Sequence, residues 1–279
     1  MIDVKNLKFG YKLFRNELFK GIDISFDSGK VYGILGKNGS GKTTFLNIIS
    51  SLIVNYNGTV KLDNISSKKR NRDYLKNIFY LPEDNLDFSR KIKNLKYLGR
   101  TYPNWDEKKF FNIIKKENLK PEQNIKNLSK GWKKRVAFYF AISVDPEILL
   151  LDEVSEGIDI IAQKELIEYL LDYFNENKTV IISSHHIEEF EKIIDEFVIL
   201  DDGKIVYKGE KEYVETNFGW TEIENRSRLN SDDILMEKSI FGKKFILTEN
   251  RKKYKNIDFE NIDLATFLKV MVNRGGKNV

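Results

Sequence analysis

A glycine-rich segment has the residue types and the spacing of a phosphate-binding loop. It runs from Gly36 to Thr43 and reads GKNGSGKT. Backbone N–H groups of such a loop, with the positive end of a following helix, stabilise the charge of a polyphosphate. Lys42 would reach the β- and γ-phosphates, and the Thr43 hydroxyl would ligate Mg²⁺. The predicted contacts to a nucleotide are Gly36, Asn38, Gly39, Ser40, Gly41, Lys42, Thr43 and Thr44.

The flanking residues supply the structural context that this phosphate loop requires. Residues 31–35 read VYGIL, which predicts a short buried strand, and residues 43–49 read TTFLNII, which predicts the opening of a helix. The alternative, an ordinary glycine-rich turn, would need both flanking signals to be accidental. The loop by itself does not distinguish kinases, GTPases, helicases and transport ATPases, because all of them use it.

Two adjacent carboxylates form a second candidate centre. Residues 147–153 read EILLLDE, an apolar run that predicts a core parallel strand delivering Asp152 and Glu153 at its carboxyl end. Asp152 would orient the Mg²⁺ shell, and Glu153 would polarise a water molecule that attacks phosphate. The alternative interpretation of such a pair is a helix cap or a solvated turn, which the phosphate loop upstream disfavours.

Length and composition limit the possible classes of protein. The chain has 279 residues, which fits one large lobe with an appended tail, and it contains no cysteine, so disulfides and thiolate metal sites are excluded. Its net charge of +5 is a mild excess, and no nucleic-acid partner is expected. The first residues contain no secretory signal, and the longest apolar stretch, residues 136–144, is shorter than the roughly 20 residues of a membrane-spanning helix. We therefore expect a soluble chain.

The segment from Leu128 to Arg135, LSKGWKKR, resembles the signature of the ATP-binding cassette (ABC) family, usually written LSGGQ. A hydroxyl at Ser129 and a glycine at Gly131 are retained at the start of a predicted helix. The cations that follow oppose the helix dipole, which phosphate proximity or contact with a partner would explain. An ordinary serine-capped surface helix is the alternative.

Two further positions take roles from the same resemblance. Tyr11 lies where the family places an aromatic ring that stacks on adenine, although packing in the core would also account for it. Glu83 lies where the family has the glutamine of a loop that links the catalytic core to a helical subdomain. A carboxylate there can ligate Mg²⁺ or its water but repels phosphate oxygens, so the hinge role is expected and the catalytic role is open. The predicted metal ligands are Thr43, Glu83 and Asp152.

The remaining family positions lie beyond the carboxylate pair. Asp159 matches the aspartate of a loop that crosses the dimer interface. His185 follows a predicted strand and matches the switch histidine, which would contact the γ-phosphate and hold the attacking water with Glu153. The adjacent His186 is expected to be a solvent or helix-start residue. The predicted catalytic residues are Glu153, His185 and Lys42.

The resemblance implies an α/β fold of the phosphate-loop NTPase class. It predicts a mixed-sheet core with an antiparallel edge subdomain, a helical subdomain at about 83–143, and a hairpin over 201–209 that closes the core. The ATPase domain would span 1–215, and residues 216–279 would form a small α/β extension ending in a helix around 262–272.

The implied function is that of an ATP-hydrolysing subunit using ATP and Mg²⁺. Two copies, or one copy and a homologous ATPase, would pair head to tail around two ATP and drive a separate membrane permease from the cytoplasmic face of the membrane. The LSKGW form of the signature resembles that of ATPases from bacterial exporters of peptides or amphipathic compounds, including phenol-soluble modulins. The alternatives are a soluble ABC ATPase acting on ribosomes or DNA, and a small-molecule kinase.

Overall fold

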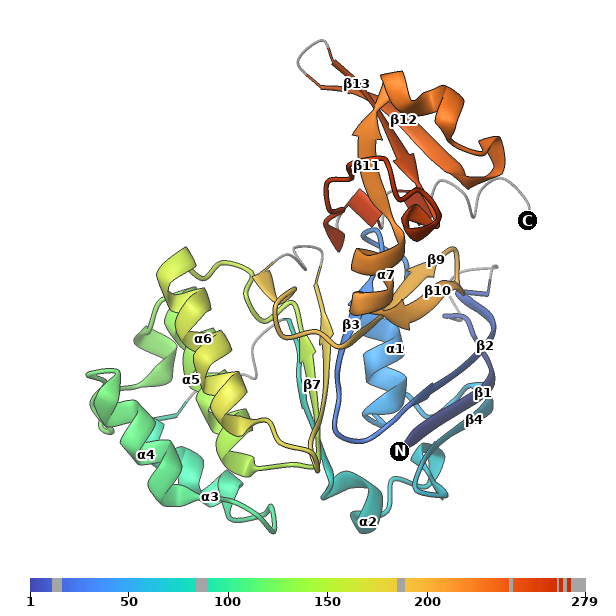
Figure 1. Cartoon of the computed structure of the whole chain (residues 1–279). Helices are drawn as coiled ribbons and strands as arrows, with labels where there is room; N and C mark the ends of the chain where they lie inside the picture. Colours follow the sequence, from blue (N-terminus) through green and yellow to red (C-terminus); the bar gives the residue numbers. More distant parts are fainter. Residues whose placement is uncertain are drawn as a thin grey trace.

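A six-stranded mixed sheet lies at the centre of the molecule (Figure 1). The computed structural model describes residues 1–11, 17–83, 90–184, 189–240, 243–264, 266–267 and 270–271. In the order β10-β9-β3-β8-β7-β6, only β10 runs antiparallel to its neighbour. The strands are β3 (Val31–Leu35), β6 (Ile78–Leu81), β7 (Ile148–Asp152), β8 (Thr179–Ser183), β9 (Glu196–Asp201) and β10 (Lys204–Glu210). The predicted strand at 31–35, the parallel strand before Asp152 and the closing hairpin are confirmed.

The apolar strands of this sheet bury both of their faces. Along β7, Leu149 and Leu151 join one hydrophobic cluster, and Ile148 and Leu150 join another. Side chains alternate between the faces of a strand, so an uninterrupted apolar run implies a layer on each side. Helix α1 (Lys42–Ile49) belongs to the second cluster, whereas α5 (Lys130–Val144) and α6 (Ile160–Tyr173) belong to the first.

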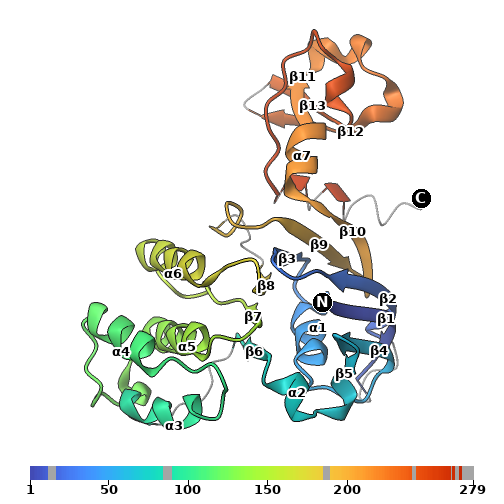
Figure 2. The same cartoon turned by 60° about the horizontal axis from the view of Figure 1, so that its bottom comes forward.

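The predicted antiparallel edge subdomain is a second sheet, whose order is β2-β1-β4-β5. Its strands are β1 (Ile2–Phe9), β2 (Phe19–Phe26), β4 (Asn57–Leu62) and β5 (Ile65–Ser66), and α2 (Arg72–Leu75) follows them. Figure 2 shows α1 between this sheet and the central one. Phe45, Leu46, Ile48 and Ile49 of α1 are therefore buried on more than one side, which holds the helix and its N-terminus in place.

Helices dominate the segment between β6 and β7, as the sequence predicts for about 83–143 (Figure 1). They are α3 (Leu95–Gly99), α4 (Glu107–Lys116) and α5. Aromatic rings join them: Phe110 of α4 lies 5.4 Å from Trp105 and 6.1 Å from Phe140 of α5, measured between ring centroids. No helix among the described residues is both long and apolar enough to cross a bilayer.

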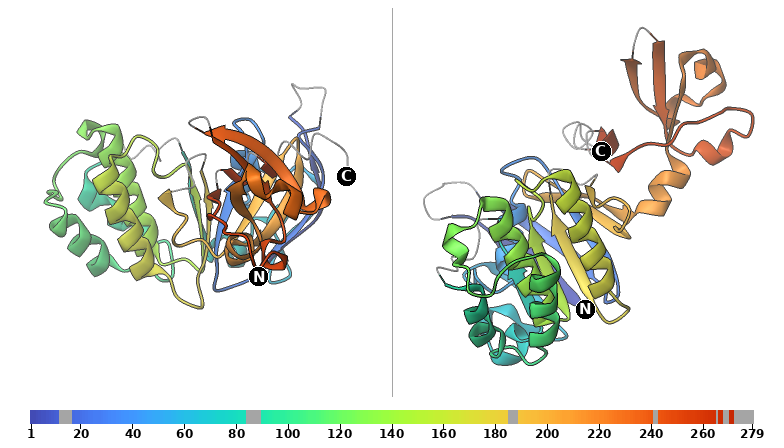
Figure 3. Two further views of the ribbon diagram at one scale, coloured as in Figure 1. Left: turned by 45° about the horizontal axis from the view of Figure 1, so that its top comes forward. Right: turned by 90° about the vertical axis from the view of Figure 1, so that its left-hand side faces the viewer.

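The C-terminal residues form a small sheet that stands away from the core beyond α7 (Lys211–Asn217), as Figure 3 shows. Its order is β11-β13-β12, with β11 (Gly219–Glu222), β12 (Ile234–Ile240) and β13 (Lys243–Thr248). Within the predicted terminal helix, the described residues from Leu264 onward are helical, whereas Ile262 and Asp263 are not. Phe267 packs against Phe197 and Tyr207 of the central sheet. The chain thus returns to the core after leaving it. The division at residue 215, which falls inside α7, stays a prediction.

Candidate functional site

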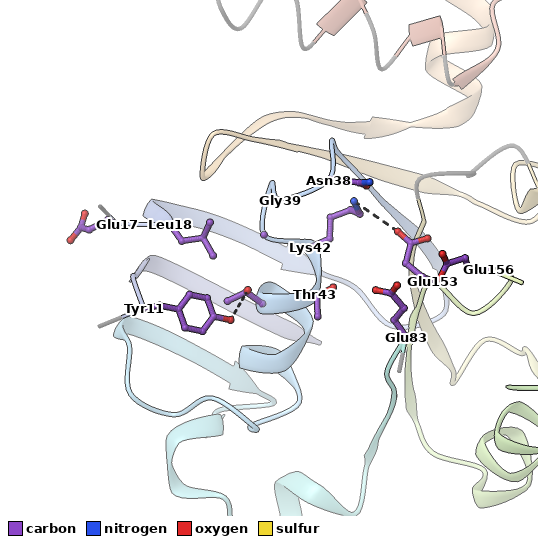
Figure 4. A pocket seen from close by; sticks show the side chains of 12 residues that line it. Tyr11, Glu17, Leu18, Asn38, Gly39, Lys42, Thr43, Glu83, Glu153 and Glu156 are labelled. Carbon is purple, nitrogen blue, oxygen red and sulfur yellow. Dashed lines mark hydrogen bonds and ion pairs between the residues drawn. The ribbon is translucent and has the colours of Figure 1, made fainter. Parts of the chain in front are cut away.

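A large cavity lies where the phosphate loop meets the carboxyl ends of β6 and β7. This first cavity has a volume of about 690 Å³. In Figure 4, Lys42 and Glu153 point toward each other, with Tyr11 and Leu18 on one side and Glu83 and Glu156 on the other. Its lining residues are Tyr11, Glu17, Leu18, Asn38, Gly39, Gly41, Lys42, Thr43, Thr44, Glu83, Glu153 and Glu156. The structure therefore brings the phosphate loop and the second predicted carboxylate together.

The phosphate loop leaves the N-terminus of α1 open toward this cavity. The N-cap residue of α1 is Gly41, and no side chain caps the helix. Gly41 has φ 104°, and a Cβ there would lie 2.7 Å from the Phe19 ring, so glycine is required. Uncapped N–H groups at a helix start need acceptors, and phosphate oxygens satisfy them while the helix dipole stabilises their charge.

Lys42 is buried beside both carbonyl and carboxylate oxygens. Its Nζ donates to the Gly36 carbonyl oxygen at 2.9 Å and lies 3.9 Å from Oε1 of Glu153. Burial lowers the pKa of Lys42, and the negative charges of Glu153, Asp152 and Glu83 oppose that shift. The ammonium group thus lies between the loop and the carboxylates, where it would form ion pairs with the terminal phosphates of a nucleotide.

Asp152 lies beneath the cavity rather than in its lining. The residue is fully buried, its Oδ2 accepts a hydrogen bond from the Tyr80 hydroxyl at 3.0 Å, and its Oδ1 accepts one from the Ser183 hydroxyl. Two hydroxyl donors therefore fix the orientation of this carboxylate. Asp152 thus stays predicted, together with Thr43, to orient the shell of a bound Mg²⁺ ion.

Glu83 and Glu156 add two carboxylates to the side of the cavity that holds Glu153 (Figure 4). Burial raises the pKa of Glu83, and so do its hydrogen bond with Glu156 and the negative charges of Glu156, Asp152 and Glu153. Carboxylates gathered in this way disfavour further negative charge unless a cation joins them. Glu83 lines the cavity as predicted for a metal ligand, and its ligand role stays a prediction.

The donor and acceptor set fits a nucleoside triphosphate with Mg²⁺. Ser40 is buried, and its Oγ has no hydrogen-bond partner within the part of the chain that the structure describes. Such an orphaned hydroxyl inside a phosphate loop suits a phosphate oxygen. The loop supplies a cation and open amides, Thr43 supplies a hydroxyl, and oxygen ligands of this kind are those that Mg²⁺ prefers. Thr43, Glu83 and Asp152 remain the residues that would hold the ion.

Tyr11 lies at the opposite end of the first cavity from Glu153 (Figure 4). Its hydroxyl is 2.9 Å from Oγ1 of Thr44, and its ring packs edge-on against Phe9 with 4.9 Å between centroids. The residue is 41% exposed, so the ring is not a core residue and part of it remains for contact with a base. The core-packing alternative is therefore disfavoured, and stacking on adenine stays a prediction.

The signature residues line a different cavity. This second cavity has a volume of about 400 Å³, and it shares no lining residue with the first. Ser129 caps α5 by accepting from the Trp132 N–H at 3.3 Å, and Asp159 caps α6 by accepting from the N–H groups of Ile161 and Ala162. The lining residues are Ser129, Lys130, Gly131, Trp132, Arg135, Gly157, Ile158 and Asp159.

The packing of the second cavity explains two features of its sequence. A Cβ at Gly131 would lie 3.2 Å from the Gly157 carbonyl oxygen, so glycine allows the helix start and the loop to approach closely. Arg135 is buried, stacks under the Trp132 ring at 4.1 Å, and forms ion pairs with Glu117 and Glu165. Internal carboxylates thus account for this cation, rather than the phosphate or partner contact that the sequence suggested.

The predicted site residues therefore separate into two groups. The first cavity contains Tyr11, Lys42, Thr43, Glu83 and Glu153, and the second contains Ser129, Gly131 and Asp159. His185 and His186 lie outside the described residues. Sequence reasoning missed Glu156 and Lys134, which meet beside Glu153. A signal for Lys134 was its helical spacing from the apolar Ala137, Phe138 and Ala141, which puts it on the buried face.

Comparisons with known proteins agree with this geometry. The model of a family described as "ABC transporter" matches residues 19–156. An ABC transporter ATP-binding protein of Methanocaldococcus jannaschii is 31% identical over 256 residues, covering 86% of this chain and 88% of the relative. The chain belongs to the ABC transporter family.

Other members of the ABC family resemble the chain over most of its length. The lantibiotic transport ATP-binding protein SrtF of Streptococcus pyogenes is 28% identical over 240 residues, covering 85% of this chain and 99% of SrtF. A solved dimeric ATP-binding cassette in a post-hydrolysis state, bound to ADP and Pi, has a TM-score of 0.64 and 23% identity. It covers 75% of this chain and 98% of the solved chain, which shows the shared ABC ATPase fold.

Proposed function

We propose that this ABC protein hydrolyses ATP as one half of a head-to-tail dimer and so drives a separate membrane permease. The observation that carries the proposal is the separation of Lys42 from Ser129 and Gly131, which line cavities with no residue in common. A chain that divides its nucleotide contacts between two places needs a second copy to complete each of them. Two-fold pairing does this for both nucleotides at once.

The residues of the first cavity would carry the chemical step. The phosphate loop and α1 bind the polyphosphate, and Lys42 neutralises charge on the terminal phosphates. Glu153, whose Oε1 lies 3.9 Å from Nζ of Lys42, would accept a proton from a water molecule that attacks the γ-phosphate. When bound, Mg²⁺ would polarise the phosphate oxygens. His185 keeps the role of positioning that water from the family resemblance alone.

The second cavity would cap the nucleotide of the other copy. Ser129 uses an oxygen lone pair to cap α5, so its hydroxyl hydrogen is still available as a donor to a phosphate. Directly after Asp159, Ile160 and Ile161 are 71% and 74% exposed. Two neighbouring isoleucines beside this cavity are costly to leave in water and would be covered by a second copy.

The proposed dimer gives ATP a direct effect on assembly. A γ-phosphate bridging two copies adds charge-assisted hydrogen bonds that exist only in the closed pair. Hydrolysis removes them and loosens the pair. A permease attached to both copies would receive this opening and closing as movement at the cytoplasmic face of the membrane.

The proposed cargo is a peptide or another amphipathic compound that is exported. Support comes from the length match to SrtF, a lantibiotic transport protein, together with the LSKGW form of the signature. The transported molecule itself would contact the permease rather than this chain. Affinity purification of the chain from detergent-solubilised membranes of its source tests the pairing: a multi-helix membrane protein should copurify, and recovery with ribosomal or repair proteins instead would contradict the transport role.

Mixing two damaged chains tests the divided site. Gly131→Asp changes a residue that lines the second cavity, and Glu153→Gln removes the proposed base of the first cavity. A mixed dimer contains one site made of an intact first cavity and an intact second cavity. The equimolar mixture should therefore hydrolyse ATP well above the sum of the separate variants, up to about a quarter of the wild-type rate by random pairing. If each chain completes its own site, the mixture will give only the average of its components, and the dimer is wrong.

A further inference from the structure

Lys134 is a buried cation that does not reach the lining of either cavity. It lies in the second turn of α5 and is 3% exposed. Its Nζ donates to the Glu153 carbonyl oxygen at 2.9 Å and lies 3.7 Å from Oε2 of Glu156. A charge buried to this degree is costly unless it is paired and hydrogen-bonded, so these two contacts determine where the side chain lies.

The Glu153 backbone needs such support because of its conformation. Its φ is 46°, in the left-handed region that disfavours residues with a Cβ. Its N–H donates to the Ser183 carbonyl oxygen at 3.0 Å, and its carbonyl oxygen accepts from the Glu156 N–H at 3.2 Å as well as from Lys134. Through this hydrogen bond, the Lys134 side chain joins the turn to α5. The direction of the Glu153 carboxylate depends on how firmly the turn is held.

Helix α5 begins at the second cavity, and one turn later its Lys134 contacts the backbone of Glu153 and the carboxylate of Glu156, two residues that line the first cavity. Ser129 and Gly131 lie at its start, and Lys134 follows within the same rigid helix. The loop that begins at Glu153 returns to the second cavity at Gly157, whose carbonyl oxygen lies against Gly131. One helix and one loop therefore connect the two cavities of a single chain, and Lys134 is the polar link between them.

We propose that Lys134 is a positioning residue that holds Glu153 in its working orientation toward the γ-phosphate of the same chain's nucleotide. The inference rests on the proposed hydrolysis of ATP in a head-to-tail dimer. Lys134 itself touches neither nucleotide nor water in this proposal. Its effect passes through the carbonyl oxygen of Glu153 and the carboxylate of Glu156.

The mixed dimer of Gly131→Asp and Glu153→Gln chains shows which of the two cavities Lys134 acts on. Its single working site takes the first cavity from the Gly131→Asp chain and the second cavity from the Glu153→Gln chain. Lys134→Met, which keeps the length of the side chain and removes the donor, is added to one chain or to the other. On the Gly131→Asp chain it should lower the rate about tenfold with KM for ATP within twofold, because the base is misdirected while binding is intact. On the Glu153→Gln chain it should change the rate less than twofold.

Controls separate this inference from folding and from the proposed function. Lys133→Met makes the same charge change on the neighbouring residue, for which the described residues show no ion pair, and should leave the rate unchanged. Glu156→Gln tests the same link without emptying a buried position and should lower kcat with KM unchanged. If Lys134→Met lowers the rate equally on either chain, the positioning role is wrong. It is also wrong if the substitution raises KM for ATP and leaves kcat unchanged. Inactivity of the mixture before Lys134 is changed would instead overturn the dimer.

Discussion

The first and second cavities use helix N-termini in opposite ways. In the first, α1 begins at Gly41 with no capping side chain, so its amides face the cavity and are left for an anion. In the second, Ser129 and Asp159 cap α5 and α6 with their own side chains. The first cavity is also lined by a lysine and four carboxylates, which are groups that move protons and bind metal ions. The second cavity is lined instead by capping residues and glycines, which would bind a nucleotide without taking part in proton transfer.

Because the two cavities differ in this way, the two halves of the proposed site are not interchangeable. Damage to the first cavity should stop chemistry and preserve assembly, because ATP can still bridge two copies. Damage to the second should weaken assembly and leave nucleotide binding by the single chain intact. For each substitution, the rate of hydrolysis, the stability of the dimer and the affinity for nucleotide should therefore be measured together.

The largest expected effect is that of Glu153→Gln. Removing a general base while keeping its shape should lower ATP hydrolysis by about 10²–10⁴-fold. Titration with a fluorescent ATP analogue should show unchanged affinity, and gel filtration with ATP should show a persistent dimer. Glu156→Gln, which alters a second carboxylate in the same lining, is the matched control and should lose far less. If the Glu153→Gln variant hydrolyses ATP at a rate within tenfold of wild type, another residue must act as the base.

Gly131→Asp should be the strongest change in the second cavity. A carboxylate there would face the phosphates of the other copy's nucleotide, and repulsion between like charges should lower hydrolysis by about 10–100-fold. The new Cβ would lie 3.2 Å from the Gly157 carbonyl oxygen, so the loop must give way slightly. The acidic side chain suits the dipole at the start of α5, and the overall fold should be retained. Phosphate release and circular dichroism measured together check this. A loss of nucleotide affinity in the monomeric chain would contradict the division of roles.

Ile161→Asp should weaken the dimer without affecting either cavity's polar groups. Losing the burial of an exposed isoleucine at an interface and burying a charge there should raise the dissociation constant of the ATP-bound dimer about tenfold or more. Analytical ultracentrifugation in the Glu153→Gln background measures it. Leu171→Asp provides a control on the same helix, since Leu171 is 53% exposed at its far end. Equal effects of the two changes would remove Ile161 from the interface.

The smallest effect is expected from the cap of α6. Asp159→Ala removes the acceptor for two backbone N–H groups and should lower the free energy of unfolding by about 1 kcal/mol, or about 2–4 °C in Tm. Asp159→Asn keeps the cap, and its Tm should match that of wild type. Hydrolysis by the asparagine variant then reports on the predicted contact of Asp159 with nucleotide, free of any change in stability. A Tm equally low in both variants would show that capping is not its structural role.

Much of the fold was predictable because the strongest signals are local. The strand before the phosphate loop, the loop, the helix after it and the apolar run ending at Asp152 follow from short patterns whose meaning does not depend on distant residues. The basic run at 133–135 was harder. Its position on α5 was predictable, but its partners Glu117, Glu156 and Glu165 lie on other elements, so no sequence window contains them.

The phosphate loop, the carboxylate pair and the signature residues are set by residue type and spacing, so short local patterns were enough to predict the kinds of chemistry open to this chain. How these residues are grouped depends instead on the packing of elements that are distant along the chain. Parallel strands bring Lys42 and Glu153 to one edge of the sheet, while α5 and α6 place Ser129, Gly131 and Asp159 around another cavity. The link through Lys134 likewise exists only after α5 packs beside β7, because a contact between elements far apart along the chain depends on packing and not on local pattern.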